Sequence, residues 1–129
     1  MSSINRKRVV SAKTTAYTVA FPGDNGKLFT NTGASGAVTF TVPAASAALV
    51  GSWFEVLVTA DQTVTVATAT TDTLIVANDI AADSIAWDQA SEKVGNGGTF
   101  ICVESGKWAL KQNAAIATVT PLTQTIATA

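Results

Sequence analysis

Histidine is absent from this chain of 129 residues, and other reactive residue types are scarce. Without histidine there can be no Ser-His or Cys-His nucleophile pair and no imidazole ligand for a metal. Cys102, the single cysteine, cannot form a disulfide within the chain, and its apolar neighbours favour a buried, unreactive thiol. Charged residues make up 13% of the sequence, against about 25% in an ordinary soluble domain. We therefore expect no enzymatic activity and no cofactor.

Long apolar runs are missing as well. No stretch reaches the roughly 18 apolar residues that a membrane-spanning helix needs. The first residues, Met1-Ser-Ser-Ile-Asn-Arg-Lys-Arg8, lack the apolar core of a signal peptide. We expect a protein that is made in the cytoplasm and has no membrane partner.

Alanine, threonine and valine dominate what is present, with 23, 20 and 14 residues. They alternate over long stretches, most clearly in Ala37-Val-Thr-Phe-Thr-Val42. A period of two predicts a strand with Val38, Phe40 and Val42 on its core face and the two threonines on the opposite face. The sequence therefore predicts that much of the chain forms β-strands.

Turn signals separate these strands at intervals of about eight to twelve residues. Asn25-Gly26 predicts a tight turn, Pro43 to Val50 a short helical turn or loop, and Ser91 to Gly98 a glycine-containing loop. Thr99 to Lys111 has the pattern of a β-hairpin turning near Gly106, with Phe100 and Cys102 on one face. These features predict an all-β fold, an antiparallel β-sandwich or jelly-roll-like barrel of about eight strands with extended terminal arms.

Composition divides the chain into a basic N-terminal arm (1–14), a β-sandwich domain (15–112) and a C-terminal arm (113–129). The last segment has too few apolar residues to fold alone, so it is either disordered or laid against a neighbour. Its candidate partner contacts are the scattered apolar residues Ile116, Val119, Leu122 and Ile126.

Charge is unevenly distributed although the net charge is only −1. Four of the eight cations precede the first acidic residue, Asp24, and these candidate contacts are Arg6, Lys7, Arg8 and Lys13. A solvated terminus is one interpretation, and an arm that docks on an acidic surface is the other. The cations have no interleaved aromatic residues, so nucleic acid is a poor candidate partner.

The three tryptophans are candidates for packing or for binding. Trp53 opens the most apolar strand, so we expect it in the core. Trp87 and Trp108 lie near strand ends, where core or subunit packing is the favoured interpretation and a sugar platform is the alternative.

A group of acidic residues around Asn78 could gather around calcium, but its spacing matches no calcium loop, so solvated loop charge is the favoured interpretation. The group comprises Asp72, Asp79, Asp83, Asp88 and Glu92. No metal site is predicted.

The order of several segments resembles small β-rich virion proteins of tailed bacteriophages, in which a strand ending in Pro-Ala-Ala leads to a glycine and an aromatic strand. The resemblance spans residues 27 to 111 and rests on Lys27-Leu-Phe-Thr-Asn31, Ala37-Val-Thr-Phe-Thr-Val-Pro43-Ala-Ala45, Gly51-Ser-Trp-Phe-Glu-Val-Leu-Val58, Gln62-Thr-Val-Thr-Val66, Asp72-Thr-Leu-Ile75 and Gly98-Thr-Phe-Ile-Cys-Val-Glu-Ser-Gly-Lys-Trp108.

The resemblance implies a structural protein of the virion, assembled in the host cytoplasm. A head decoration or cement protein that contacts the major capsid protein or other virion subunits is the first expectation. A tail or head fibre module that binds a host receptor or glycan is the alternative, and another structural or adhesive β module is a third. A symmetric homo-oligomer, dimer or trimer, is expected in the favoured case.

Overall fold

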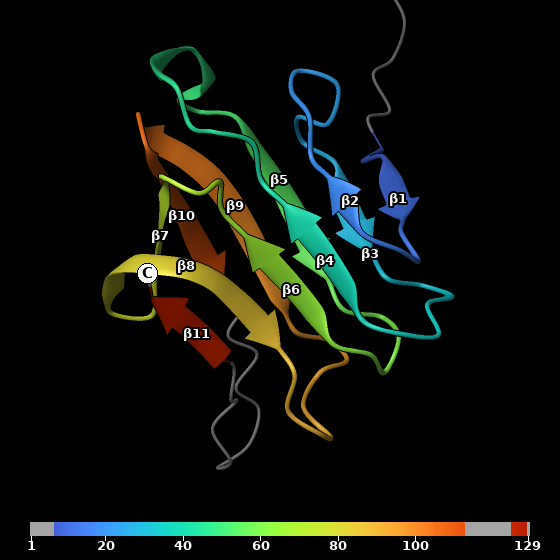
Figure 1. The fold of residues 1–129 in the computed structure, drawn as a ribbon. Coiled ribbons are helices and arrows are strands. Elements are labelled where there is room, and N and C mark those ends of the chain that lie inside the picture. Colours follow the sequence, from blue (N-terminus) through green and yellow to red (C-terminus); the bar gives the residue numbers. More distant parts are fainter. Residues whose placement is uncertain (1–6, 113–124, 129) are drawn as a thin grey trace, which may run out of the picture.

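The computed structural model describes residues 7–112 and 125–128, and in these residues it confirms an all-β fold (Figure 1). The first six strands are β1 (Val10–Ala12), β2 (Tyr17–Thr18), β3 (Leu28–Thr30), β4 (Val38–Thr41), β5 (Trp53–Leu57) and β6 (Val64–Ala67). The remaining five are β7 (Thr73–Val76), β8 (Asp79–Trp87), β9 (Gly97–Glu104), β10 (Lys107–Gln112) and β11 (Thr125–Thr128). One helical turn, η1 (Ala47–Leu49), lies in the segment where a short helix or loop is predicted. No helix of the described residues is long and apolar enough to cross a membrane.

The first six strands wind back and forth between two facing parts of one sheet. Strands β1, β3 and β5 pair in parallel with one another, and so do β2, β4 and β6. We call β1, β3, β5 and β9 the β5 half, and β2, β4, β6 and β8 the β6 half. Both halves therefore grow by one parallel strand with each turn of the chain.

Strands β10 and β7, together with the first part of β8, join the two halves. The continuous path runs β1-β3-β5-β9-β10-β7-β8-β6-β4-β2, and β11 pairs with β8 beside this path. The sheet curls, so that its two terminal strands β1 and β2 lie near one end of the molecule and β7 and β10 lie at the other (Figure 1). One end of the molecule thus carries both terminal strands of this path.

This architecture differs from the predicted antiparallel sandwich or jelly-roll of about eight strands, which is not confirmed. In residues 7–112 and 125–128, eleven strands form one sheet, and five of its ten strand pairs are parallel. The first six strands alternate between the halves, so four of these parallel pairs join strands that are two apart in the sequence, and the fifth joins β7 to β10. Such pairing leaves no local turn signal, whereas a hairpin does.

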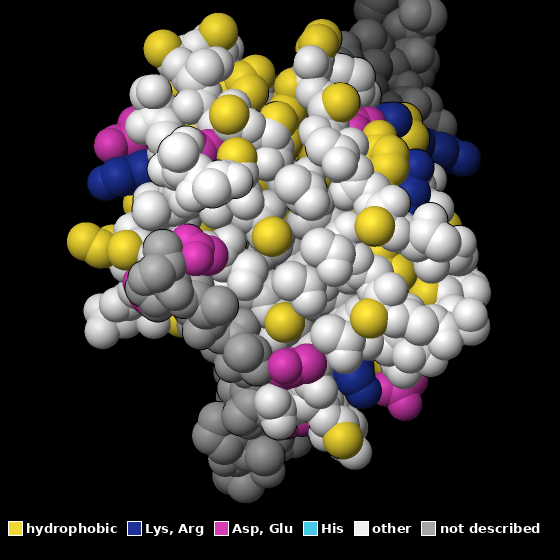
Figure 2. All heavy atoms as spheres, in the orientation of Figure 1, with side chains coloured by type: hydrophobic (Ala, Val, Ile, Leu, Met, Phe, Trp, Pro, Cys, Tyr) yellow, Lys and Arg dark blue, Asp and Glu magenta, His cyan; other side chains and the backbone are white. Residues whose placement is uncertain are grey.

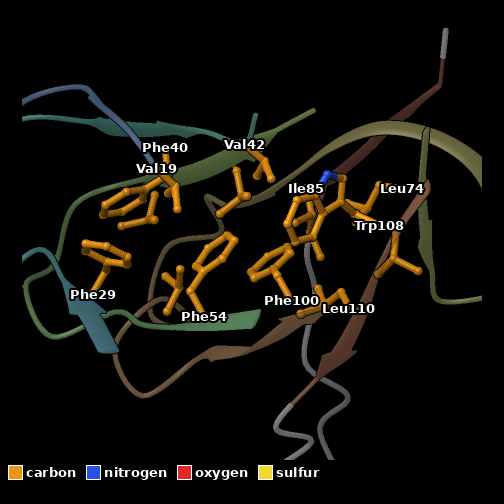
Figure 3. Close-up of a cluster of buried hydrophobic side chains, with 14 of the residues drawn as sticks. Val19, Phe29, Phe40, Val42, Phe54, Leu74, Ile85, Phe100, Trp108 and Leu110 are labelled. Carbon is orange, nitrogen blue, oxygen red and sulfur yellow. The ribbon is translucent and has the colours of Figure 1, made fainter. Parts of the chain in front are cut away.

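A continuous aromatic and aliphatic core fills the space between the halves (Figure 3). The Phe29 and Phe40 rings, from opposite halves, have centroids 5.5 Å apart. Phe54 stacks on Phe100 at 5.1 Å and meets Trp108 edge-on at 6.1 Å. Burial of each such ring contributes about 2–3 kcal/mol through removal of apolar surface from water. The predicted core face of Val38, Phe40 and Val42 is confirmed.

Backbone spacing is tightest where β9 begins. The predicted loop Ser91 to Gly98 ends earlier than expected, because Gly97 and Gly98 already belong to β9. A Cβ atom on Gly97 would lie 1.9 Å from the Val56 carbonyl oxygen of β5. These glycines allow β5, β9 and β10 to approach one another.

Candidate functional site

The described part of the basic segment contacts the body of the protein. The Arg8 guanidinium forms an ion pair with Glu55 and lies 5.2 Å from the centre of the Trp53 ring. The Lys13 ammonium lies 3.9 Å above the ring of Tyr17. Lys7 is exposed, and Arg6 falls outside the described residues. Two of the four predicted arm contacts therefore have partners within this chain.

Strand β1 lies within the predicted N-terminal arm. Val9 O accepts a hydrogen bond from Leu28 N at 2.9 Å, and Lys13 N donates one to Thr30 O at 2.8 Å. Because successive residues of a strand point their backbone groups to opposite sides, Ser11 also faces β3. The N–H and C=O groups of Val10 and Ala12 then point away from the sheet.

The candidate contact residues Trp87 and Trp108 are fully buried. Trp108 donates a hydrogen bond from Nε1 to the Pro43 carbonyl at 3.1 Å. Trp87 meets Phe100 edge-on, with ring centroids 6.4 Å apart. Of the two favoured interpretations, core packing and subunit packing, the structure shows core packing for both rings, and neither offers a surface to a sugar or a partner.

Trp53 shows the opposite outcome, and its predicted core position is wrong. Strand β5 alternates, with Phe54 and Val56 buried and Trp53, Glu55 and Leu57 half-buried. The outward Trp53 ring lies beside Gly26, where a Cβ would be 3.6 Å from the ring, and beneath Arg8. This alternation is hard to recognise in the sequence of residues 53–57, because Glu55 is the only polar residue among the outward positions.

The C-terminal candidate residues are only partly described. Ile116, Val119 and Leu122 lie outside the described residues. The backbone of Ile126 in β11 pairs with Ile85 of β8, in an antiparallel register. Residues 125–128 of the predicted C-terminal arm therefore belong to the sheet.

Asp24 is a buried carboxylate with several bonds, and it links β2 to the start of β3. It is 3% exposed, and its Oδ2 accepts hydrogen bonds from the Tyr17 hydroxyl at 2.7 Å and the Ala20 N–H at 2.9 Å. Lys27 Nζ lies 3.0 Å from its Oδ1. Burial acts to raise the pKa of Asp24, but these three donors outweigh it and hold that pKa below the usual value. The hydrogen bond to Asp24 raises the pKa of Tyr17.

Other candidate chemistry does not assemble. Within the described part of the chain, no three His, Cys, Asp or Glu side chains come together as metal ligands, so the acidic residues around Asn78 form no such group. Asp72 instead accepts a hydrogen bond from the Ala45 N–H at 2.6 Å. Burial raises the pKa of the Cys102 thiol, as its apolar neighbours predict.

The two outer faces differ in composition. Outward positions of the β5 half include Leu28, Trp53, Leu57 and Ile101, all half-buried. Those of the β6 half are small, and include Thr18, Thr39, Thr41, Thr65, Ser84 and Ala86. Figure 2 shows a face of the molecule made largely of uncharged polar groups with isolated apolar side chains, and Lys and Arg side chains lie beside β1 at its edge. Within the described residues, the chemical differences therefore lie between the outer faces and not in a pocket.

Comparison with known proteins adds no relative. The sequence matches no protein-family model and no curated protein.

Proposed function

We propose that the protein is a structural protein of a bacteriophage virion, and specifically a capsid decoration or cement protein that stabilises the head lattice. The virion context is supported by the order of segments from residue 27 to residue 111, which resembles small virion proteins. The binding role is supported by the end of the molecule that carries β1 and β2, where both terminal strands of the continuous path lie near one another beside basic residues.

The proposed subunit is a symmetric homo-oligomer, dimer or trimer, that contacts the major capsid protein or other virion subunits. Its two halves act as the layers of a sandwich, because the rings of Phe29 and Phe40 meet between them. Uncharged outer faces favour broad contact, and many copies on one lattice gain by avidity what each contact lacks.

The decisive experiment is the copy number per particle, measured by quantitative mass spectrometry of purified virions. Hundreds of copies are expected for a decoration protein. A few copies or tens would indicate a fibre or tail part, and absence from the particle would refute a virion role.

A truncation can test the N-terminal contact without damage to the fold. Deletion of residues 1–13 would remove β1 and the Arg8–Glu55 ion pair, whereas deletion of residues 1–6 keeps both. We expect the shorter deletion to weaken binding to purified heads while the melting temperature stays unchanged. Unchanged binding would exclude residues 1–6 from the contact.

The second candidate is a fibre module that binds a host glycan. Burial removes Trp87 and Trp108 as platforms, but Trp53 keeps part of its ring exposed beside Arg8. A glycan array should then show saturable binding that Trp53→Ala abolishes. No binding by the wild-type protein would remove this candidate.

A further inference from the structure

The outer edge of β1 has the geometry of a strand acceptor. Strand β1 pairs only with β3 on the described path of the sheet, and the backbone groups of Val10 and Ala12 point away from it. Unpaired N–H and C=O groups in an extended strand form a template on which another strand can add. Over Val10–Ala12 this template is about 10 Å long, at roughly 3.3 Å per residue.

Apolar side chains at this edge are unusually exposed. Val9 and Val10 are 57% and 60% exposed, among the highest values for large apolar residues in the described chain. A strand added beside β1 would cover these side chains, in the same way that the adjacent strands β3 and β5 cover each other's side chains. Strand β1 contains no proline, no charged residue and no bulge, three of the features that block strand addition.

Charge defines the kind of strand that fits. Lys7, Arg8 and Lys13 flank β1, and no acidic residue occurs between residues 1 and 23. Arg8 is neutralised by Glu55, whereas Lys7 is exposed. A second copy of β1 would bring like charges together, but a strand with carboxylates would meet opposite charge.

We propose that the edge of β1 binds an extended acidic segment of another protein, which adds to the sheet beside β1. Main-chain hydrogen bonds to Val10 and Ala12 provide the register, and carboxylates paired with the flanking cations provide selectivity. Each contact is short and therefore weak, which suits a subunit that binds in many copies. This inference names the partner of the proposed structural role and rests on it.

The probe is an acetylated and amidated seven-residue peptide of alternating Val and Glu, titrated into the full-length protein and followed by NMR. We expect saturable shifts of the Val10 and Ala12 amides, with affinity lowered at least about tenfold when salt rises from about 50 to 500 mM. The same peptide with Lys in place of Glu should bind at least about tenfold more weakly. Equal binding of the two peptides, or no saturation by about 5 mM, would overturn the proposal.

Two matched pairs of variants separate the edge from the rest of the sheet. Ala12→Pro removes an outward N–H and leaves the bonds to β3, so we expect at least about tenfold weaker binding with little change in melting temperature. Thr18→Pro removes the corresponding outward N–H of β2, the other edge, and should bind the peptide normally. Likewise Lys7→Glu should weaken binding. Lys111→Glu makes an equal charge change at an exposed residue of β10 and should not weaken binding.

The remaining outcomes each count against the proposal. Normal binding by Ala12→Pro, or loss in Thr18→Pro alone, would place the contact elsewhere. A dimer seen by light scattering that Ala12→Pro dissolves would make a second copy the occupant. The copy number per virion is independent of these results, so peptide binding without virion incorporation would refute only the proposed function, and incorporation without peptide binding would refute only the edge.

Discussion

The β5 half and the β6 half grow by the same winding, yet they present different outer surfaces. In the β5 half, strands β3 and β5 turn Phe29 and Phe54 inward, and in the β6 half, strands β4 and β6 turn Phe40 and Val66 inward. Outward, the β5 half has Trp53 beneath Arg8, whereas the β6 half has short hydroxyl and methyl groups.

The difference shows which positions the fold constrains. Inward positions must fill one shared core, so both halves use the same residue types there. Outward positions have no such requirement, so their residue types can differ between the two halves. Strand β1 extends the β5 half, which places the proposed binding edge beside its more apolar face.

The largest expected loss of stability tests the close approach of β5 and β9 within the β5 half. Gly97→Ala would place a Cβ 1.9 Å from the Val56 carbonyl oxygen, so β5 and β9 must separate. We expect a loss of more than about 4 kcal/mol in the free energy of unfolding, or no folded protein. Gly36→Ala, next to β4 in the β6 half, has no atom within 4 Å of its new Cβ and should change stability by less than about 0.5 kcal/mol. Equal urea midpoints for the two variants would contradict this account of β9.

The outer faces can be compared directly. Trp53→Ala should cost about 2 kcal/mol, because the half-buried ring contacts Gly26 and the Arg8 guanidinium. Thr39→Ala on the exposed face of β4 should cost about 0.5 kcal/mol or less. Urea denaturation of both variants gives the values. Similar losses would mean that the two outer faces contribute alike to stability.

Asp24 links the halves, since it binds Tyr17 of β2 and Lys27 before β3. Asp24→Asn should cost about 1–2 kcal/mol at pH 7. Because the folded state lowers the pKa of Asp24, the unfolded chain binds its proton first as pH falls, and this stabilisation is lost below about pH 4. The wild-type and Asp24→Asn melting temperatures should therefore converge in acid, as calorimetry between about pH 7 and pH 2.5 can show. A constant difference would indicate that the side-chain charge is not the cause.

The smallest effect concerns the β7–β8 hairpin, which joins its strands by a tight turn, unlike the parallel strands of either half. Ala77 and Asn78 both have positive φ, 47° and 70°. Ala77→Gly should relieve this strain and raise stability by about 0.5 kcal/mol, while Ala81→Gly in β8 should lower it by about the same amount. Thermal melting distinguishes the two, and a loss in Ala77→Gly would mean that the turn is not strained.

Local patterns in the sequence predict the elements well. The alternation around Phe40 gives the buried face of β4, and the hairpin pattern gives β9 and β10 with Gly106 in the turn, at a φ of 81°. The turn at Asn25-Gly26 is confirmed as well. Each depends on neighbours in the chain, which a pattern can reveal. The hairpin at Ala77-Asn78 was missed because alanine is a weak turn signal.

Long-range arrangement could not be predicted in the same way. The parallel pairing of β4 with β6 joins strands separated by all of β5, so no turn or spacing specifies it. The same holds for the partners of the basic segment. Arg8 pairs with Glu55 because a single strand, β3, separates β1 from β5 in the sheet. Composition does not reveal this strand order, and it led to the prediction that the arginine belongs to an arm.

The winding also determines how the molecule should respond to mechanical force. In the described part of the chain, β1 forms a backbone ladder only with β3, and β2 forms one only with β4, so a pull on the N-terminus loads one short ladder at a time. Extension should begin with detachment of β1 and then β2, in small separate steps, before the core of Phe29 and Phe54 is stretched. Optical-trap traces from an N-terminal handle would record those steps, and a single abrupt rupture would show that the turns unfold together.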